Sequence, residues 1–316
     1  FSVVVMTNIH HEHLDYHGTF EHYRDSKKRL FTLANKNKKG LRVGVLNAED
    51  PSAELFAAAI ANPVSYGIDA GDLRAKDVRL ASNGSKFRAI IGDEEYQMEC
   101  NLPGGFNVMN SLAAIGVGRA VGLSRKQIET GIASLKSVEG RMARIDEGQD
   151  FDVIIDYAHT PDSFEKIFQE VRSTVKGKLI VVFGSAGRRD ETKRAEQGRL
   201  AAKYCDIVIA TEEDDRDIDG QLILKQIAEG AIEGGKKLDK NLLLIHQREE
   251  AVTAAIQMAK KGDMVLLLGK GHEKSILTNK PGIIHTEADN FDEATMTISR
   301  PYSEEAVARK ALKNLH

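Results

Sequence analysis

Four histidines and two acidic residues lie within the segment TNIHHEHLDYHG, residues 7–18 of the chain. The segment follows the apolar run FSVVV, which is typical of a short buried strand. Imidazoles and carboxylates just beyond a strand can bind a divalent cation, although Mg²⁺ prefers oxygen and accepts few protein ligands. A polar loop leading into a helix also fits this spacing, so the residues alone leave both interpretations open.

Two glycine-rich segments could hold an anion. Gly184–Asp190 (GSAGRRD) offers backbone N–H groups and two guanidinium groups, but it lacks the third glycine of a dinucleotide fingerprint, and a tight turn explains it equally well. Gly269–Glu273 (GKGHE) also follows a strand. Neither is a Walker A loop, and the nearest match, Gly230–Lys236, is followed by Lys237 where that pattern needs Ser or Thr. The basic helix face around Lys27 carries no functional signal by spacing alone.

The composition is that of a folded protein with room for two domains. The chain has 316 residues, of which 41% are hydrophobic and 29% charged. A formal charge of −3 gives no basic field for nucleic acid, so we expect no nucleic-acid partner. Apolar runs such as 264–268 fall far short of the roughly 20 residues that cross a membrane. Cys100 and Cys205 are typical of idle thiols in a reducing cytosol.

The hydrophobic pattern predicts an α/β fold, with a turn at Val138–Arg141 as the linker between domains 1–140 and 141–316. In the first domain we expect strands at 3–6 and 41–46, helices at 20–34, 107–121 and 124–135, and a hairpin of 86–91 with 95–100. The second domain has continuous apolar strands at 153–155, 179–183, 207–210, 242–245 and 264–268. Such runs, separated by helices, indicate a Rossmann-like, doubly wound, mostly parallel sheet.

In such a sheet the ligand site lies beyond the carboxyl ends of the strands. The polar residues that follow these strand ends are Asp156, His159, Gly184–Asp190, Glu212–Arg216 and Gly269–Glu273. We therefore expect them to gather at one edge and to bind an anion or a small molecule.

Taken together, the motifs resemble those of the Mur ligase family, most closely its tripeptide-synthetase branch. The similar segments, in chain order, are TNIHHEHLDYHGTFEHYRDSK, LPGGFNVMNSLAA, VEGRMARID, DYAHTPDSFEK, GSAGRRDETKR and GKGHE. Six motifs in register are specific where one would be weak. The resemblance implies the rear part of a P-loop-type central domain followed by a Rossmann-like C-terminal domain.

The resemblance also implies a reaction. ATP phosphorylates a carboxylate to an acyl phosphate, which an incoming amine attacks, and cations offset the repulsion between the anionic groups. By family likeness His13 is a Mg²⁺ ligand, with Asn8 nearby. Lys27 is implied to be carbamylated by CO₂ and so to bind a second Mg²⁺.

The same likeness assigns contacts to the two substrates. Asn107 and Asn110 match nucleotide-binding positions, Arg141 a phosphate or ribose contact, and Asp156, Tyr157 and His159 the edge over ribose and adenine. The positions that match diamino-acid contacts are Arg189, Asp214, Arg216, Gly269 and Glu273. The implied partners are UDP-MurNAc-L-Ala-D-Glu and a diamino acid, and the implied protein is a cytoplasmic monomer.

Several residues depart from the family pattern. Enzymes that use meso-diaminopimelate have DNPR where this chain has Asp214-Asp215-Arg216, so Arg216 remains to pair with a distal carboxylate while Asn and Pro are replaced. An extra Asp could instead attract the distal ammonium of lysine or ornithine, and meso-diaminopimelate is only slightly favoured. Glu12 and Arg188 both replace the more usual Asp.

The family's UDP-sugar domain and Walker A loop are expected before Phe1, where the chain begins in a strand without an initiator Met. We therefore expect residues 1–316 alone to be inactive. Two alternatives stay open: a non-catalytic module that binds a nucleotide or muropeptide, and a related ligase such as one that adds glutamate to folate. The opening segment, DYAHTPD and GKGHE argue against the folate ligase.

Overall fold

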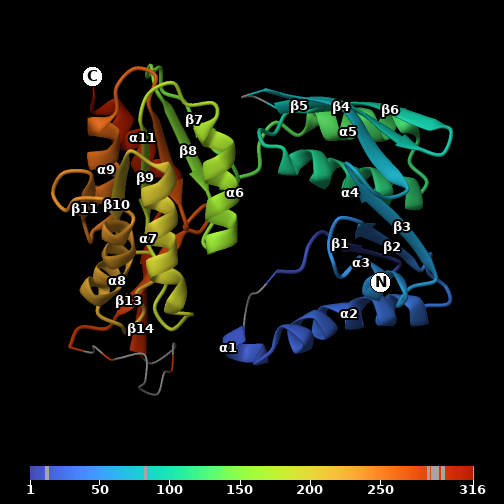
Figure 1. Cartoon of the computed structure of the whole chain (residues 1–316), viewed down its shortest axis with the longest axis horizontal. Helices are drawn as coiled ribbons and strands as arrows, with labels where there is room; N and C mark the ends of the chain where they lie inside the picture. The colour runs from blue at the N-terminus through green and yellow to red at the C-terminus, as the bar shows by residue number, and fades with distance from the viewer. Residues whose placement is uncertain (11–13, 82–83, 283–284, 286–291, 293–295, 316) are drawn as a thin grey trace. The chain divides into compact units, whose positions relative to one another are not determined.

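The computed structural model describes residues 1–10, 14–81, 84–282, 285, 292 and 296–315 (Figure 1). The chain forms two compact units, Phe1–Ser137 and Val138–His316. Within the described ranges, no helix combines the length and the apolar character that crossing a membrane requires.

In its described part, unit 1 (Phe1–Ser137) contains a six-stranded sheet in which the strands follow one another in chain order. The strands are β1 (Val3–Met6), β2 (Val43–Asn47), β3 (Asn62–Gly67), β4 (Leu73–Ala81), β5 (Gly84–Ile91) and β6 (Glu94–Cys100). The first four pair in parallel, and β4, β5 and β6 form an antiparallel meander. The hairpin that the sequence predicts is therefore confirmed, whereas β3 and β4 carry many polar residues and were not expected.

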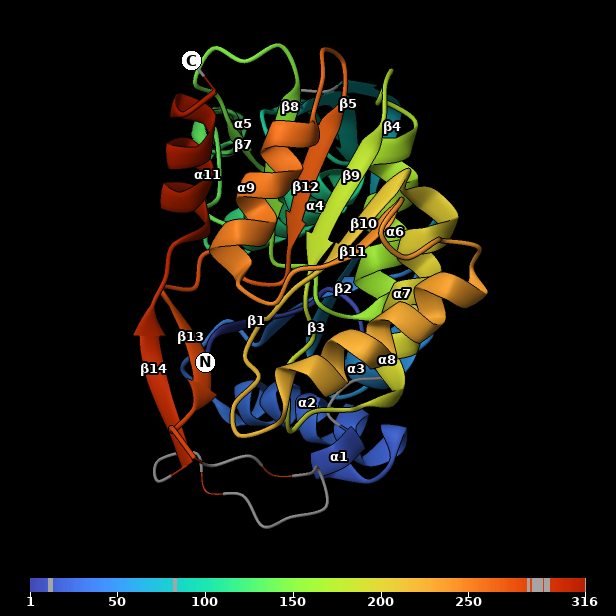
Figure 2. The same ribbon diagram turned by 90° about the vertical axis from the view of Figure 1, so that its left-hand side faces the viewer.

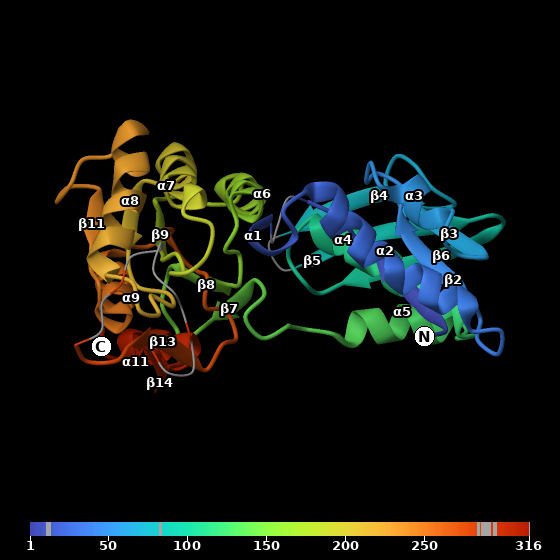
Figure 3. The ribbon, with the colours of Figure 1, turned by 90° about the horizontal axis from the view of Figure 1, so that it is seen from below.

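Helices cover both faces of the unit 1 sheet, as Figure 3 shows from below. One face packs against α2 (Phe20–Lys36) and α3 (Ala53–Ala57), and the other against α4 (Phe106–Ala120) and α5 (Arg125–Ser134). A short helix, α1 (Leu14–His17), precedes α2. The Thr19 side chain accepts a hydrogen bond from His22 N–H, which fixes the residue at which α2 begins.

The main sheet of unit 2 (Val138–His316) has the strand order β11-β10-β9-β12-β8-β7 among the described residues. Its strands are β7 (Ala143–Ile145), β8 (Asp152–Asp156), β9 (Leu179–Phe183), β10 (Ile207–Ala210), β11 (Leu242–Leu244) and β12 (Met264–Leu268). All neighbours pair in parallel except β7, which runs antiparallel to β8. The predicted mostly parallel sheet is therefore confirmed. A separate ribbon of β13 (Ser275–Asn279) and β14 (Thr297–Pro301) was not predicted.

This sheet is covered on both faces, which explains its continuous apolar strands. Figure 2 shows α9 (Arg248–Met258) and α11 (Glu304–Lys313) on one face. The helices α6 (Pro161–Arg172), α7 (Thr192–Tyr204) and α8 (Gly220–Glu233) pack on the other. Because β8, β9, β10 and β12 are parallel, the residues after them emerge at one edge of the sheet.

Candidate active site

In unit 1, the segment after β1 is held against the end of β2 by two hydrogen bonds. Asn47 Nδ2 donates to Thr7 O at 2.7 Å, and Ile9 N–H donates to the buried Asp50 carboxylate at 2.7 Å. Asn8 lies between these anchors and is exposed to solvent. His13 and Glu12 lie outside the described residues, so the predicted metal ligand His13 stays a prediction.

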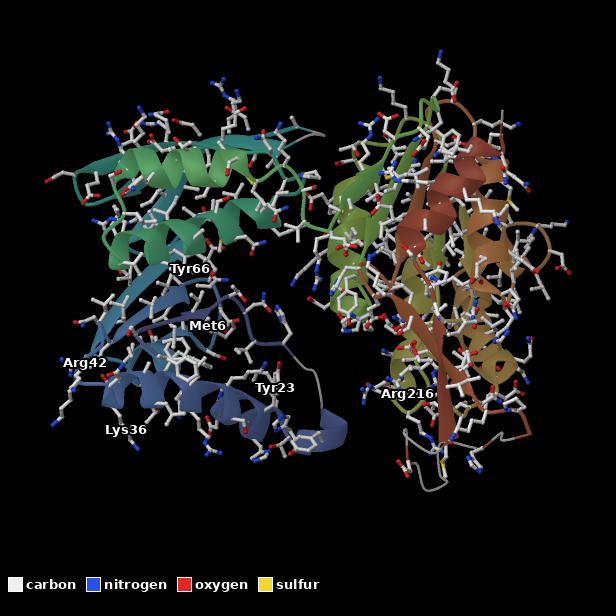
Figure 4. The ribbon with its side chains drawn as sticks, turned by 180° about the vertical axis from the view of Figure 1, so that it is seen from behind. Met6, Tyr23, Lys36, Arg42, Tyr66 and Arg216 are labelled. Carbon is white, nitrogen blue, oxygen red and sulfur yellow. The ribbon has the colours of Figure 1, made fainter. Side chains whose placement is uncertain are left out.

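Lys27 lies on the exposed side of α2, one turn after the buried Tyr23, which Figure 4 labels. Its Nζ is 5.2 Å from the centroid of the Tyr23 ring, which in turn lies 5.3 Å from the His17 ring. Tyr23 therefore contacts both Lys27 and His17, a histidine of the opening segment. An exposed amine in this position is open to CO₂, so carbamylation of Lys27 is sterically compatible with the fold.

Asn107 and Asn110 lie in the first turns of α4, directly after the glycine turn of LPGGFN. Gly104 has φ +109°, which favours glycine strongly. Asn107 is buried, and its Nδ2 donates to Pro103 O at 2.6 Å while its Oδ1 accepts from Asn110 Nδ2 at 3.0 Å. Asn107 therefore fixes the turn, and the exposed Asn110 is the one of the two that a ligand can reach.

In unit 2, an aromatic and cationic cluster forms beyond β8. The Arg141 guanidinium lies 4.7 Å from the centroid of the Tyr157 ring, and the rings of His159 and His272 lie 4.9 Å and 5.3 Å from it. Such a cluster can stack on a planar base and neutralise a phosphate. Gly140 makes this packing possible, because a Cβ there would lie 2.2 Å from His272 N.

Asp156 ends β8 and is 8% exposed. Its carboxylate accepts hydrogen bonds from Met142 N–H and Ala158 N–H, both at 2.8 Å. Burial nevertheless raises the pKa of Asp156 above its usual value, because removal of water outweighs these two donors. Its backbone carbonyl accepts from Gly269 N–H at 3.2 Å, which ties the end of β8 to the GKGHE loop after β12.

Lys270, the lysine of GKGHE, lies at the centre of the strand-end site and is 1% exposed. Its Nζ is 2.9 Å from Asp214 Oδ1 and 2.7 Å from Glu273 Oε2. The other Glu273 oxygen accepts from Tyr157 OH at 3.3 Å. The fold therefore brings Asp214 and Glu273 to the Lys270 ammonium and Tyr157 to Glu273. The sequence pattern alone did not predict a role for Lys270.

The loop after β10 carries a second buried carboxylate, Glu213. Among the described residues, Glu213 Oε2 is buried without a hydrogen-bond partner, and burial raises the pKa of this group. Gly269 makes room for it, since a Cβ at that position would lie 2.7 Å from Glu213 Oε2. Burial lowers the pKa of nearby Lys193, whose Nζ lies 3.5 Å from His159 O. Glu213 lies within the predicted segment Glu212–Arg216, although no separate role was assigned to it. Lys193, in the first turn of α7, was not predicted.

The predicted arginines differ in their surroundings. Arg216, labelled in Figure 4, is buried, has φ +55°, and its Nη1 donates to Gly187 O at 2.9 Å, so in this conformation it fixes the loop. Arg189 is exposed. Arg188, the departure from the usual Asp, makes two hydrogen bonds to Asp217 at 2.9 and 2.7 Å. The role of Arg216 with a distal carboxylate stays a prediction.

Fold and site together define a two-unit α/β protein with aromatic, cationic and buried carboxylate groups at the strand ends of a doubly wound sheet. Residues 1–118 match the Mur ligase middle domain, and residues 140–271 match the Mur ligase glutamate ligase domain. The chain therefore belongs to the Mur ligase family.

Relatives with similar sequences carry names from one branch of this family. A UDP-N-acetylmuramyl-tripeptide synthetase of Roseiflexus sp. (strain RS-1) is 41% identical over 325 residues, which cover 100% of this chain and 60% of that protein. A protein of the same name from Treponema denticola is 43% identical, covering 99% of this chain and 58% of its own. The chain thus spans about three fifths of the length of these relatives.

Solved structures agree on the fold. A UDP-N-acetylmuramoyl-L-alanyl-D-glutamate–2,6-diaminopimelate ligase matches with a TM-score of 0.59 and 26% identity, covering 100% of this chain and 61% of that one. The folylpolyglutamate synthase of Mycobacterium tuberculosis matches with a TM-score of 0.67 over 85% of this chain and 61% of its own. At 18% identity, the second match supports the fold alone.

Proposed function

We propose that the chain is part of an ATP-dependent amide-bond ligase that adds a diamino acid to UDP-MurNAc-L-Ala-D-Glu in the cytoplasm. The observation that carries this proposal is the ion cluster of Lys270, Asp214 and Glu273 at the strand ends of unit 2. The proposal is supported by two tripeptide synthetases, whose sequences match this chain over 99% or more of its length. For the folate alternative, the match to a folylpolyglutamate synthase at 18% identity supports the fold alone.

The chemistry requires an acyl phosphate and a neutral amine to meet. The amine attacks the acyl carbon, and the tetrahedral intermediate collapses to an amide and inorganic phosphate. Mg²⁺ would be held by His13 and carbamylated Lys27, and it would neutralise the phosphates. In unit 2, Arg141 and Tyr157 would bind the nucleotide. In unit 1, the exposed Asn110 matches a nucleotide-binding position of the family and would be a further contact.

The contacts of unit 2 also bear on the choice of amino acid. Asp214 is already paired with Lys270, so its carboxylate gives little extra attraction to the distal ammonium of lysine. Among the described residues, Glu213 Oε2 is buried without a hydrogen-bond partner, and it suits an amino group of any of these diamino acids. The pairing of Asp214 therefore supports meso-diaminopimelate over lysine, in line with the diaminopimelate ligase of Syntrophomonas wolfei, which is 39% identical over 276 residues.

The test is phosphate release from a form of the protein that includes a phosphate-binding loop. The assay supplies UDP-MurNAc-L-Ala-D-Glu, ATP and either meso-diaminopimelate, lysine or ornithine. We expect the highest rate with meso-diaminopimelate. If lysine gave an equal or higher rate, the amino-acid assignment would be wrong while the ligase assignment would stand.

Residues 1–316 alone form the matched control, because they contain no Walker A loop. We expect this chain to release no more phosphate than its Lys27→Ala variant. Turnover by residues 1–316 above that variant would contradict this part of the proposal.

A further inference from the structure

A group of three potential metal ligands lies next to the strand-end site. Glu212 and Asp215 come from the loop after β10, and His246 follows β11. One ligand atom from each of the three lies within 4.8 Å of the other two. The two acidic residues are 3% and 4% exposed, whereas the His246 side chain is 32% exposed. A cation can therefore enter from solvent on the imidazole side.

The hydrogen bonds within this group leave ligand atoms available. His246 Nε2 lies 2.6 Å from Asp215 Oδ2, but Asp215 Oδ1 is buried and has no hydrogen-bond partner among the described residues. On Glu212, Arg300 Nη2 and Arg248 N–H both contact Oε1, at 2.5 and 3.1 Å. A buried carboxylate oxygen without a partner is costly, and a bound cation would satisfy it.

The charges around the group permit a cation. Arg248 is paired with Glu304, and Arg300 contacts both Glu212 and Glu249, so Glu249 still balances Arg300 when Glu212 binds a cation. Gly220 leaves the space free, since a Cβ there would lie 2.1 Å from His246 Nε2.

We propose that Glu212, Asp215 and His246 form a binding site for a divalent transition metal such as Zn²⁺. One imidazole and two carboxylates suit Zn²⁺ with a water molecule as the fourth ligand. Tetrahedral bonds of about 2.0–2.2 Å place ligand atoms roughly 3.4 Å apart, so binding needs shifts on the order of 1 Å. Asp215 stands where the DNPR pattern has Pro, and metal binding would link the loop that carries Asp214 and Arg216 to the end of β11.

The test is Zn²⁺ binding to the 316-residue chain by competition with a chromophoric chelator, compared between His246→Gln and His285→Gln. His285→Gln is a closely matched control, because the His285 side chain is also 32% exposed and its Nδ1 lies 2.8 Å from the buried Asp217 Oδ2. It differs in that both oxygens of Asp217 already accept hydrogen bonds from Arg188. Other histidines contribute equally to both variants.

We expect His246→Gln to lose one Zn²⁺ per chain, or to weaken that site at least about tenfold, while His285→Gln matches the wild type. Asp215→Asn should behave like His246→Gln, and circular dichroism checks that each variant is folded. With Co²⁺, the visible absorption of a low-symmetry site should disappear in the same two variants. Equal Zn²⁺ stoichiometry and affinity in wild type, His246→Gln and His285→Gln would overturn the proposal.

Discussion

The candidate residues of the two units are held in different ways. In unit 2, Lys270, Asp214 and Glu273 form an ion cluster around a nearly inaccessible ammonium, and backbone N–H groups fix Asp156. In unit 1, Lys27 and Asn110 lie on exposed helix surfaces. The difference teaches that unit 2 presents a preorganised site, whereas in unit 1 the ligands themselves must supply much of the order.

The largest effect should come from breaking the ion cluster of unit 2. Lys270→Met leaves two carboxylates without their shared cation, and we expect a loss of about 3 kcal/mol in the free energy of unfolding. Lys274→Met is the control, because its partner Glu139 and Lys274 itself are largely exposed, and its loss should stay below about 0.5 kcal/mol. Urea unfolding followed by circular dichroism measures both. Equal losses would show that burial of the cluster does not matter.

In unit 1, a smaller effect should appear at alkaline pH. Burial, with help from Asp50 and Glu49, raises the pKa of Tyr66 from 10.0 to about 12. The pKa of Tyr66 is higher in the folded state than in the unfolded state, so the phenol contributes fully to the free energy of unfolding below pH 10. This contribution, about 2–3 kcal/mol, is lost as the pH rises through 12. Tyr66→Phe should remove this term from the pH dependence of unfolding. If the free energy of unfolding changed with pH in the same way for wild type and Tyr66→Phe between pH 9 and about 12, this prediction would be wrong.

A third comparison lies within α4. Asn107→Ala removes a partly buried hydrogen bond to Pro103 O and should cost about 1–2 kcal/mol of stability. Asn110→Ala removes only the hydrogen bond that the exposed Asn110 side chain donates to Asn107 Oδ1, so it should cost less, about 0.5 kcal/mol. Thermal unfolding of the two variants separates the structural asparagine from the accessible one. A similar loss for both would mean that the exposed position is also structural.

A further small effect on stability is expected at Lys27. Its Nζ contacts the Tyr23 ring at an exposed position, so Lys27→Ala should lower stability by no more than about 1 kcal/mol. Turnover of a form with a phosphate-binding loop should nevertheless be lost. A large loss of stability would favour a structural role for Lys27.

Much of the fold of unit 2 could be predicted because its strands are continuous apolar runs. The β10 and β12 strands, for example, have the bounds that the hydrophobic pattern predicts. In unit 1, β3 begins with Asn62 and Pro63 and is only half-buried, so it carries no comparable signal. The strands β13 and β14 form by pairing with each other, and neither the periodicity nor the composition of their sequences indicates a strand.

The site was predictable where residues end a strand or directly follow one. Asp156 and Gly269 are of this kind, and the parallel pairing of β8 with β12 explains why they meet. The role of Lys270 was missed because its partner Asp214 lies 56 residues earlier. The Asp215 and His246 pair, 31 residues apart, was missed for the same reason. Contacts over such separations depend on the strand order, which local patterns do not encode.

The most direct measurement of the central claim is product formation by mass spectrometry with a form that includes a phosphate-binding loop. With ATP, UDP-MurNAc-L-Ala-D-Glu and meso-diaminopimelate, we predict the amide-linked tripeptide product in wild type and none in Lys27→Ala. A wild-type protein that binds both substrates without forming the amide would contradict the account and would favour a non-catalytic binding module.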